Sequence, residues 1–279
     1  MSASARARAE AVEKADRPRS AGARVLAPLG LGIVLVATWE FLVWYWAVPK
    51  FVLPAPSLIA QSFAQDYGTL FGSLWITLKI TVLAFLIALV AGVALATLFA
   101  QSEIVEMSLF PYAVILQVTP IVSIAPLILI WVGLDNIERA LLILATIVAF
   151  FPILSNMILG LRSVDHNLRN LFDLYGASRW QRLTELQFPS ALPYLLGGMR
   201  ISGGLALIGA VVAEFVAGSG TGTGLAWRIV ESANRLNIPR MFAALLMLSL
   251  LGIAIFLVLT ALQTFLLRRW HESAIRREN

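Results

Sequence analysis

Few residues of this chain have the types and spacing needed for covalent chemistry or metal binding. The sequence contains no cysteine, and its two histidines, His166 and His271, cannot form a metal site by themselves. It also lacks the His-Glu-x-x-His, serine-elbow and paired-carboxylate patterns of hydrolases and metalloproteases. The sequence therefore predicts no catalytic residue, no metal site and no cofactor.

A glycine-rich segment invites a phosphate-binding interpretation. GSGTGTG places glycine at every second position, namely at Gly218, Gly220, Gly222 and Gly224. A P-loop follows a strand and ends in Gly-Lys-Ser/Thr, and that ending is missing here. We expect a flexible loop between two apolar helices instead of a nucleotide site.

Two charged residues inside apolar runs are candidates for the path of a transported solute. Glu214 lies in LALIGAVVAEFVAG, and an acidic residue within a membrane segment usually faces protein or water. A place in the translocation pathway and a place at the outer membrane surface fit it equally well. Arg200 could face a central cavity, or extend its long side chain to the membrane surface.

The composition places these residues in a membrane protein. Hydrophobic residues make up 59% of the 279 residues and charged residues 13%, against about 45–50% and 25% in soluble proteins. The basic residues lie in tails and loops that flank apolar runs, not in a basic and aromatic patch, so we expect no nucleic-acid partner. The lipid bilayer is the expected environment.

Six apolar runs are long enough to span a bilayer, which requires about 20 residues. The third run contains Pro120 and Pro126, each of which removes a backbone donor, so it is kinked, broken or re-entrant. The fold class predicted is an all-α integral membrane protein with about six transmembrane helices, at residues 25–47, 75–100, 107–133, 137–161, 191–217 and 242–267.

The distribution of basic residues predicts the orientation. Fourteen of the 21 Lys and Arg residues lie in the N-terminal tail, the loop after the fourth helix and the C-terminal end. The positive-inside rule places these segments, and both termini, in the cytoplasm. We predict a disordered cytosolic tail over 1–23, a permease domain over 24–268 and a cytosolic C-terminal tail over 269–279.

The loop after the fourth helix, Asn167–Pro193, contains an amphipathic helix. Leu168, Leu171, Phe172 and Tyr175 recur at helical spacing and form one apolar face. Gly176 follows where a left-handed C-terminal cap is favoured. This helix could rest on the lipid surface, or dock onto a partner protein.

A second helix is predicted directly after Gly176. Ser178 and Gln181 have the spacing of a capping box. Pro189 disfavours helix at Phe188, and Pro193 suits the first turn of the next helix, so we expect the chain to turn there and enter the membrane.

This loop resembles the cytoplasmic loop of ABC importer permeases. The family pattern is Glu-Ala-Ala, three residues, Gly, nine residues, then Ile-x-Leu-Pro, and Gly176, Leu186, Phe188 and Pro189 keep its spacing. Asn170, Leu171 and Phe172 stand in place of Glu-Ala-Ala. The stretches 51–59, 120–134 and 205–224 are similar to the branch that serves nitrate, taurine, sulfonates and thiamine or riboflavin precursors.

The resemblance implies a type I ABC importer permease fold in a bacterial inner membrane, with the family core at about 70–265. It implies a dimer, expected to contain identical copies, joined to two ABC ATPase subunits that hydrolyse the ATP. A periplasmic or lipid-anchored solute-binding protein would deliver a small solute. The loop 163–190 would couple the permease to the ATPase through Leu168, Asn170, Leu171, Phe172, Tyr175, Gly176, Ala177, Ser178 and Pro189.

The alternative function is an ion-coupled secondary transporter. Such proteins bind protons or sodium at intramembrane acids, and Glu214 is the main candidate in this chain. No inverted repeat, a common feature of those transporters, is apparent in the sequence.

Overall fold

The computed structural model describes residues 21–217 and 224–268. Most of the predicted N-terminal tail and the C-terminal tail 269–279 lie outside the described residues. Gly218, Gly220 and Gly222 of the predicted loop lie outside them as well. The chain divides into two units, residues 1–61 and 62–279, and each is considered by itself.

The first unit contains α2 (Ala21–Tyr45) and the first turn of α3 (Pro56–Gln101). Glu40 of α2 accepts hydrogen bonds from the Ser57 backbone N–H (3.0 Å) and the Ser57 hydroxyl (2.7 Å). The first backbone N–H groups of a helix have no acceptor within the helix, so Glu40 supplies the acceptor for one of them. This carboxylate connects the end of α2 to the start of α3.

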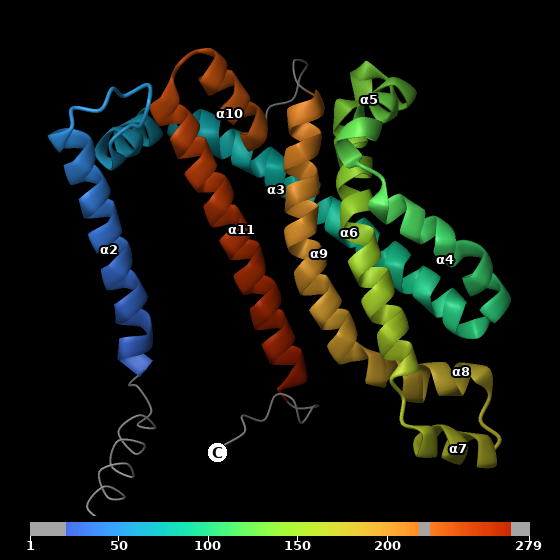
Figure 1. The fold of residues 1–279 in the computed structure, drawn as a ribbon. Coiled ribbons are helices and arrows are strands. Elements are labelled where there is room, and N and C mark those ends of the chain that lie inside the picture. The colour runs from blue at the N-terminus through green and yellow to red at the C-terminus, as the bar shows by residue number, and fades with distance from the viewer. Residues whose placement is uncertain (1–20, 218–223, 269–279) are drawn as a thin grey trace, which may run out of the picture. The chain divides into compact units, whose positions relative to one another are not determined.

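The described part of the second unit consists of helices joined by short turns (Figure 1). After α3, its elements are α4 (Glu103–Val118), α5 (Ile121–Val132), the 3₁₀ turn η1 (Leu134–Asn136), α6 (Ile137–Arg162), α7 (His166–Leu174), α8 (Arg179–Gln181), the π-helical turn η2 (Arg182–Gln187), α9 (Phe188–Ala217), α10 (Leu225–Asn234) and α11 (Ile238–Leu267).

The described helices confirm the prediction of about six membrane spans. Five of them are long and apolar enough to cross a membrane, and α4 with α5 makes a sixth if this bent pair counts as one span. The pair bends by 103° at the break between Val118 and Ile121. Thr119 is extended there, as expected for a residue before proline, and Pro120 precedes α5. The break predicted in the third apolar run is therefore present.

Helices α6 and α9 pack closely because small residues line their contact. A Cβ added to Gly209 of α9 would lie 2.9 Å from Ala145 Cα of α6. At Gly198 it would lie 2.8 Å from Asn156 Cβ. The buried Ser202 hydroxyl donates to the Ala149 carbonyl across the same contact (2.6 Å). Small residues let membrane helices approach closely, so α6 and α9 form a tightly packed centre of the second unit.

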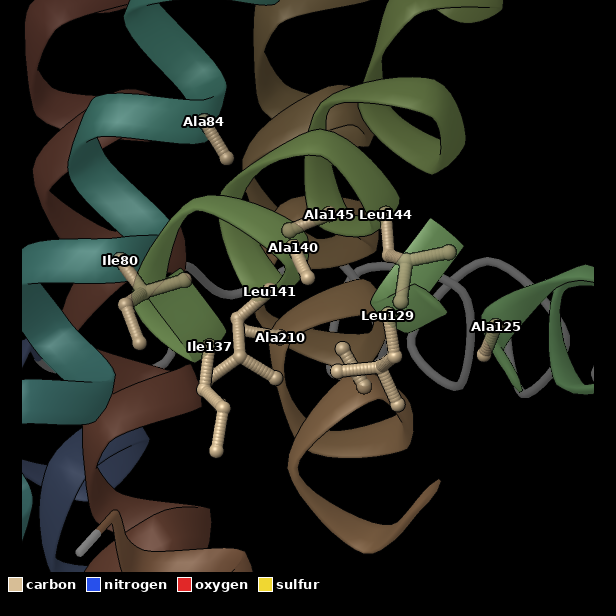
Figure 2. Close-up of a cluster of buried hydrophobic side chains, with 11 residues drawn as sticks. Ile80, Ala84, Ala125, Leu129, Ile137, Ala140, Leu141, Leu144, Ala145 and Ala210 are labelled. Atoms are coloured by element: carbon tan, nitrogen blue, oxygen red, sulfur yellow. The ribbon is translucent and has the colours of Figure 1, made fainter. Parts of the chain in front are cut away.

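A cluster of buried apolar side chains joins α3 and α5 to this pair. Figure 2 shows α3 residues on one side and α5 residues on the other, with α6 side chains between them. The cluster fixes the position of α5 even though α5 follows a sharp bend. Its labelled members are Ile80, Ala84, Ala125, Leu129, Ile137, Ala140, Leu141, Leu144, Ala145 and Ala210.

The prediction that Pro189 interrupts the helix at Phe188 was wrong, although the chain does change direction where α8 leads into α9 (Figure 1). A continuous helical segment runs from Arg179 to Ala217, and Phe188 is helical. Just before Pro189 the helix widens into η2, where the Phe188 N–H bonds to the Leu183 carbonyl. A π-helical turn of this kind accommodates a residue that disturbs regular α-helical bonding. The proline therefore changes the helix locally without ending it.

Candidate functional site

Helix α7 begins at a side-chain cap. The Asp165 carboxylate accepts hydrogen bonds from the backbone N–H groups of Asn167 (2.7 Å) and Leu168 (3.4 Å). A carboxylate at this position satisfies amides that lack helical partners and complements the helix dipole. Sequence reasoning had not identified this cap, although Asp165 stands immediately before the amphipathic pattern.

The end of α7 has the geometry that the glycine predicted. Gly176 has φ of +66°, in the left-handed region. The Ala177 N–H bonds to the Phe172 carbonyl at 2.9 Å, and the Gly176 N–H bonds to the Asp173 carbonyl at 3.1 Å. The predicted left-handed cap is confirmed.

The second helix begins with the predicted capping box. The Gln181 N–H donates to Ser178 Oγ at 3.2 Å, and the Ser178 N–H donates to Gln181 Oε1 at 2.8 Å. An ion pair between Arg182 and Asp173 (2.7 Å) joins this helix to α7. Residues 165–187 thus form a helical hairpin, which we call the α7–α8 hairpin.

Large apolar side chains of this hairpin are exposed. Leu174 is 85% exposed, Tyr175 84% and Trp180 70%, whereas Leu168 and Leu171 are about half exposed. Phe172 is partly buried. Exposed apolar groups on a polar segment are typical of a protein or membrane contact. Sequence reasoning missed Leu174 and Trp180, because they fall outside the helical face that the periodicity defined.

The other end of the hairpin is fixed in the apolar core. Leu183 is 2% exposed and Leu186 7%. Leu183 belongs to a buried cluster with Phe99 of α3 and with Met157 and Leu161 of α6. Figure 1 shows α7 and α8 next to the ends of α6 and α9. A force on the exposed residues would therefore reach α6 and α9 through packed side chains.

Glu214 occupies a different and buried place. It is 3% exposed. Its carboxylate accepts from the Thr77 hydroxyl (2.7 Å) and from the Ala226 N–H (2.9 Å). Thr77 Oγ1 in turn accepts from the Leu225 N–H (2.9 Å). These bonds connect α9 and α3 to the first turn of α10.

Gly224 is required for this arrangement. It immediately precedes α10, and a Cβ added to it would overlap the Glu214 carboxylate. The last glycine of GSGTGTG therefore permits a close approach to a carboxylate, not to a phosphate. Helix α10 follows this segment, between the fifth and sixth predicted spans, where the sequence analysis predicted no helix. Apolar residues at Leu225, Ile229 and Ala233 gave a helical spacing that could have revealed it.

Charged side chains hold the other end of α10. Arg228 pairs with Glu231 at 2.7 Å and donates to Ser73 Oγ of α3 at 2.9 Å. Arg235 also pairs with Glu231, at 3.1 Å. The hydrogen bond from Arg228 and the nearby positive charges hold the pKa of Glu231 below its usual value.

The structure does not bring Arg200 and Glu214 together. Both belong to α9, and fourteen residues separate them by about 21 Å along the axis. The Arg200 side chain is exposed, and its guanidinium lies 5.7 Å from the centre of the Phe256 ring of α11. This distance suits a cation–π contact. The two residues therefore do not form one solute site within a single chain.

No group of three or more His, Asp or Glu residues is arranged to bind a metal ion in the described parts of the chain. His166 opens α7 and is exposed, and His271 lies outside the described residues.

Comparison with known proteins gives the family. Residues 84–272 match the family described as "Binding-protein-dependent transport system inner membrane component". The riboflavin transport system permease protein RibX of Chloroflexus aurantiacus is 35% identical over 250 residues, which cover 88% of this chain and 91% of RibX. The formylaminopyrimidine transport permease protein ThiX of Halalkalibacterium halodurans is 30% identical, over 88% of this chain and 96% of ThiX.

A solved structure agrees with the fold. A chain from the crystal structure of an amino acid ABC transporter with histidines superposes with a TM-score of 0.60 at 18% identity, over 75% of this chain and 97% of that one. These matches support the importer over the ion-coupled alternative. The chain belongs to the binding-protein-dependent inner membrane components, and it is a multi-pass permease subunit of an ABC importer.

Proposed function

We propose that the α7–α8 hairpin docks onto an ABC ATPase subunit and transmits its ATP-driven motion to α6 and α9. The observation that carries this proposal is the exposure of Leu174, Tyr175 and Trp180 on a hairpin whose other end is buried. A helical hairpin that inserts exposed apolar side chains into a groove is a common mode of protein recognition.

The anchoring of the hairpin supports a mechanical role. Its capping box, its left-handed cap and the Arg182–Asp173 pair keep the two helices in one geometry. Leu183 and Leu186 connect that geometry to the membrane helices. When two ATPases close on ATP, hairpins on two permeases would move together and switch the helices between inward-open and outward-open states. The ATPase subunits, and not this chain, would hydrolyse the ATP.

The complete importer would contain two copies of this permease, expected to be identical, two ATPase subunits and a solute-binding protein. The bias of basic residues supports a cytoplasmic position for the hairpin and both termini, and the cell would be bacterial. We retain residues 24–268 as the permease domain, between cytosolic tails.

We propose a small heterocyclic vitamin or vitamin precursor as the solute. The two relatives described above have names that specify riboflavin and formylaminopyrimidine. An anion such as a sulfonate or nitrate is the second candidate, because other relatives, at 30% and 29% identity, are named for those solutes. Uptake of labelled solutes by cells that express the chain with its partners would separate the two classes.

We also propose different pathway roles for the two charged residues of α9. Glu214 would act indirectly, by holding α10 in place. Arg200 would be available to a solute, because its side chain is exposed and no carboxylate pairs with it among residues 21–217 and 224–268. Replacement of Arg200 by Gln should then change uptake without changing ATPase binding.

Copurification tests the docking role. We expect the wild-type chain, extracted in mild detergent, to bring down an ABC ATPase, and Leu174→Asp with Tyr175→Asp to lose at least nine tenths of it. Asn167→Asp with Thr184→Asp is the matched control, because it adds the same charge at exposed polar positions of the hairpin. Equal recovery of the ATPase with both double variants would contradict the proposal.

A further inference from the structure

A polar cavity of about 560 Å³ lies between the hairpin and the junction of α3 with α4. Its walls come from residues 100–104 and from the hairpin with Val164. A volume of this size falls within the range of roughly 300–1,000 Å³ that is usual for small-molecule sites. The cavity lies entirely within the second unit, and the docking function proposed above does not use it.

Three arginines line the cavity, namely Arg169, Arg179 and Arg182. Glu103 is the only carboxylate among its lining residues, so the lining carries a net positive charge. Ser102 and Gln187 add neutral polar groups. A site of this composition favours an anion that also offers a hydroxyl to a carboxylate or amide.

The pairing of the arginines distinguishes the cavity from its surroundings. Arg162, outside the cavity, pairs with Glu106. Arg169 and Arg179 have no ion-pair partner in the described part of the chain. Arg182 does pair with Asp173, but its Nε is buried and lacks a hydrogen-bond partner among the described residues. The cavity therefore collects positive charge and a buried donor that no described residue satisfies.

The position of the cavity indicates the source of the anion. Three candidate membrane spans end beside it: α3 ends at Gln101, α6 ends at Arg162, and the span that includes α9 begins at Arg179. These ends mark the level at which helices leave the bilayer. Basic pockets between membrane helices at this level bind the headgroups of anionic lipids.

We infer that the cavity binds the phosphate group of an anionic phospholipid, with phosphatidylglycerol as the best fit. The guanidinium groups of Arg169 and Arg179 would bind the phosphate oxygens, since arginine matches phosphate geometry in a bidentate manner. Glu103 and Gln187 can accept hydrogen bonds from the glycerol hydroxyls. A bound lipid would join the α3–α4 junction to the hairpin.

Lipid binding to the purified full-length chain tests the inference without any ATPase. Native mass spectrometry would compare retention of phosphatidylglycerol and phosphatidylcholine by the wild type, Arg169→Gln with Arg179→Gln, and Arg162→Gln with Arg268→Gln. The last variant removes two exposed arginines at the ends of α6 and α11, neither of which lines the cavity. We expect roughly 10- to 30-fold weaker phosphatidylglycerol binding in the cavity variant alone, since each basic residue near a membrane contributes several-fold.

Two further measurements distinguish a lipid phosphate from free inorganic phosphate, and a loss of binding from a loss of folding. Arg169→Lys with Arg179→Lys keeps the charge and should restore most of the binding. Millimolar inorganic phosphate should compete weakly with the lipid. Strong competition by phosphate, with no preference for phosphatidylglycerol, would overturn the lipid assignment and show a soluble ligand. Equal phosphatidylglycerol binding by all the variants, or no binding of either lipid or phosphate, would overturn the site itself.

Discussion

At the scale of single residues, Glu214 shows how one buried carboxylate can fix the start of a helix. It bonds to Thr77, 137 positions earlier, and to Ala226 in α10. Buried amides and carboxylates are costly to leave unpaired, so each partner depends on the others. Sequence reasoning identified Glu214 as unusual but could not find its partners, because long-range bonds leave no local pattern.

Replacement of Glu214 by Ala should lower the free energy of unfolding by about 2 kcal/mol, because buried donors at Thr77 and Ala226 lose their acceptor. Glu214→Gln keeps one acceptor oxygen and should cost less. Thermal unfolding in detergent measures both changes. Glu138→Ala is the control, because its pair with Lys79 is exposed and contributes about 0–1 kcal/mol. Similar losses for Glu214→Ala and Glu138→Ala would contradict a structural role for Glu214.

The lowered pKa of Glu231 predicts that the stability of α10 depends on pH. Its pKa is lowered in the folded protein, so the charged form contributes stability that is present above the usual value of about 4.5. That contribution should disappear as the pH falls below 4.5 and through the lower folded pKa. Hydrogen exchange of α10 amides between pH 7 and pH 3 should show the loss in the wild type and a smaller one in Glu231→Gln. The same pH response in both proteins would refute this role.

At the scale of elements, the hairpin depends on one left-handed residue. Gly176 has φ of +66°, and no atom lies within 4 Å of a Cβ added there. Substitution would therefore act through backbone strain and not through crowding. Periodicity and capping rules predicted both helices of the hairpin, because these features are local. They failed at Pro189, where packing of Leu183 and Leu186 keeps the helix continuous through a π-helical turn.

Gly176→Val should distort the hairpin at a cost of about 1–2 kcal/mol and reduce ATPase binding. Gly176→Asn is the matched control, since asparagine tolerates the left-handed region and the site has room for it. Copurification and ATP-dependent uptake would be measured for both variants. Undiminished ATPase binding and uptake in Gly176→Val would show that the cap geometry is unimportant for coupling.

The α6–α9 contact predicts a contrast between two glycines of one helix. Gly209→Ala should destabilise the protein by about 1–3 kcal/mol, because its Cβ would lie 2.9 Å from Ala145 Cα. Gly204→Ala should be neutral or slightly stabilising, since no atom lies within 4 Å of its Cβ. Thermal unfolding in detergent should rank them in this order. The reverse order would contradict the close packing of α6 against α9.

At the scale of the whole molecule, hydropathy predicted the fold class and the number of spans. Long apolar runs are a strong signal, because a bilayer excludes unpaired backbone groups and so requires helices. The signal is weaker for α10, which is short and amphipathic, and for the exposed Trp180, which no periodicity marked. The α7–α8 hairpin was recognisable from the sequence, whereas the polar contacts around it and around α10 needed the fold.

The absence of cysteine permits a clean test of orientation. We expect Asn234→Cys, at the end of α10, to react with a membrane-impermeant maleimide in cells whose outer membrane alone is permeabilised. Thr184→Cys, in the hairpin, should react only after the inner membrane is opened. Both positions are exposed, so access and not burial controls the labelling. Labelling in the opposite pattern would reverse the proposed topology.

Photocrosslinking from the hairpin tests the central claim most directly. A photoreactive amino acid would replace Tyr175, which is 84% exposed, and separately Leu236, which is 76% exposed beside α10. In cells that express the whole importer, Tyr175 should give an adduct with an ABC ATPase, and Leu236 should not. Adducts with lipid alone at Tyr175, or an ATPase adduct at Leu236, would contradict docking of the hairpin onto the ATPase.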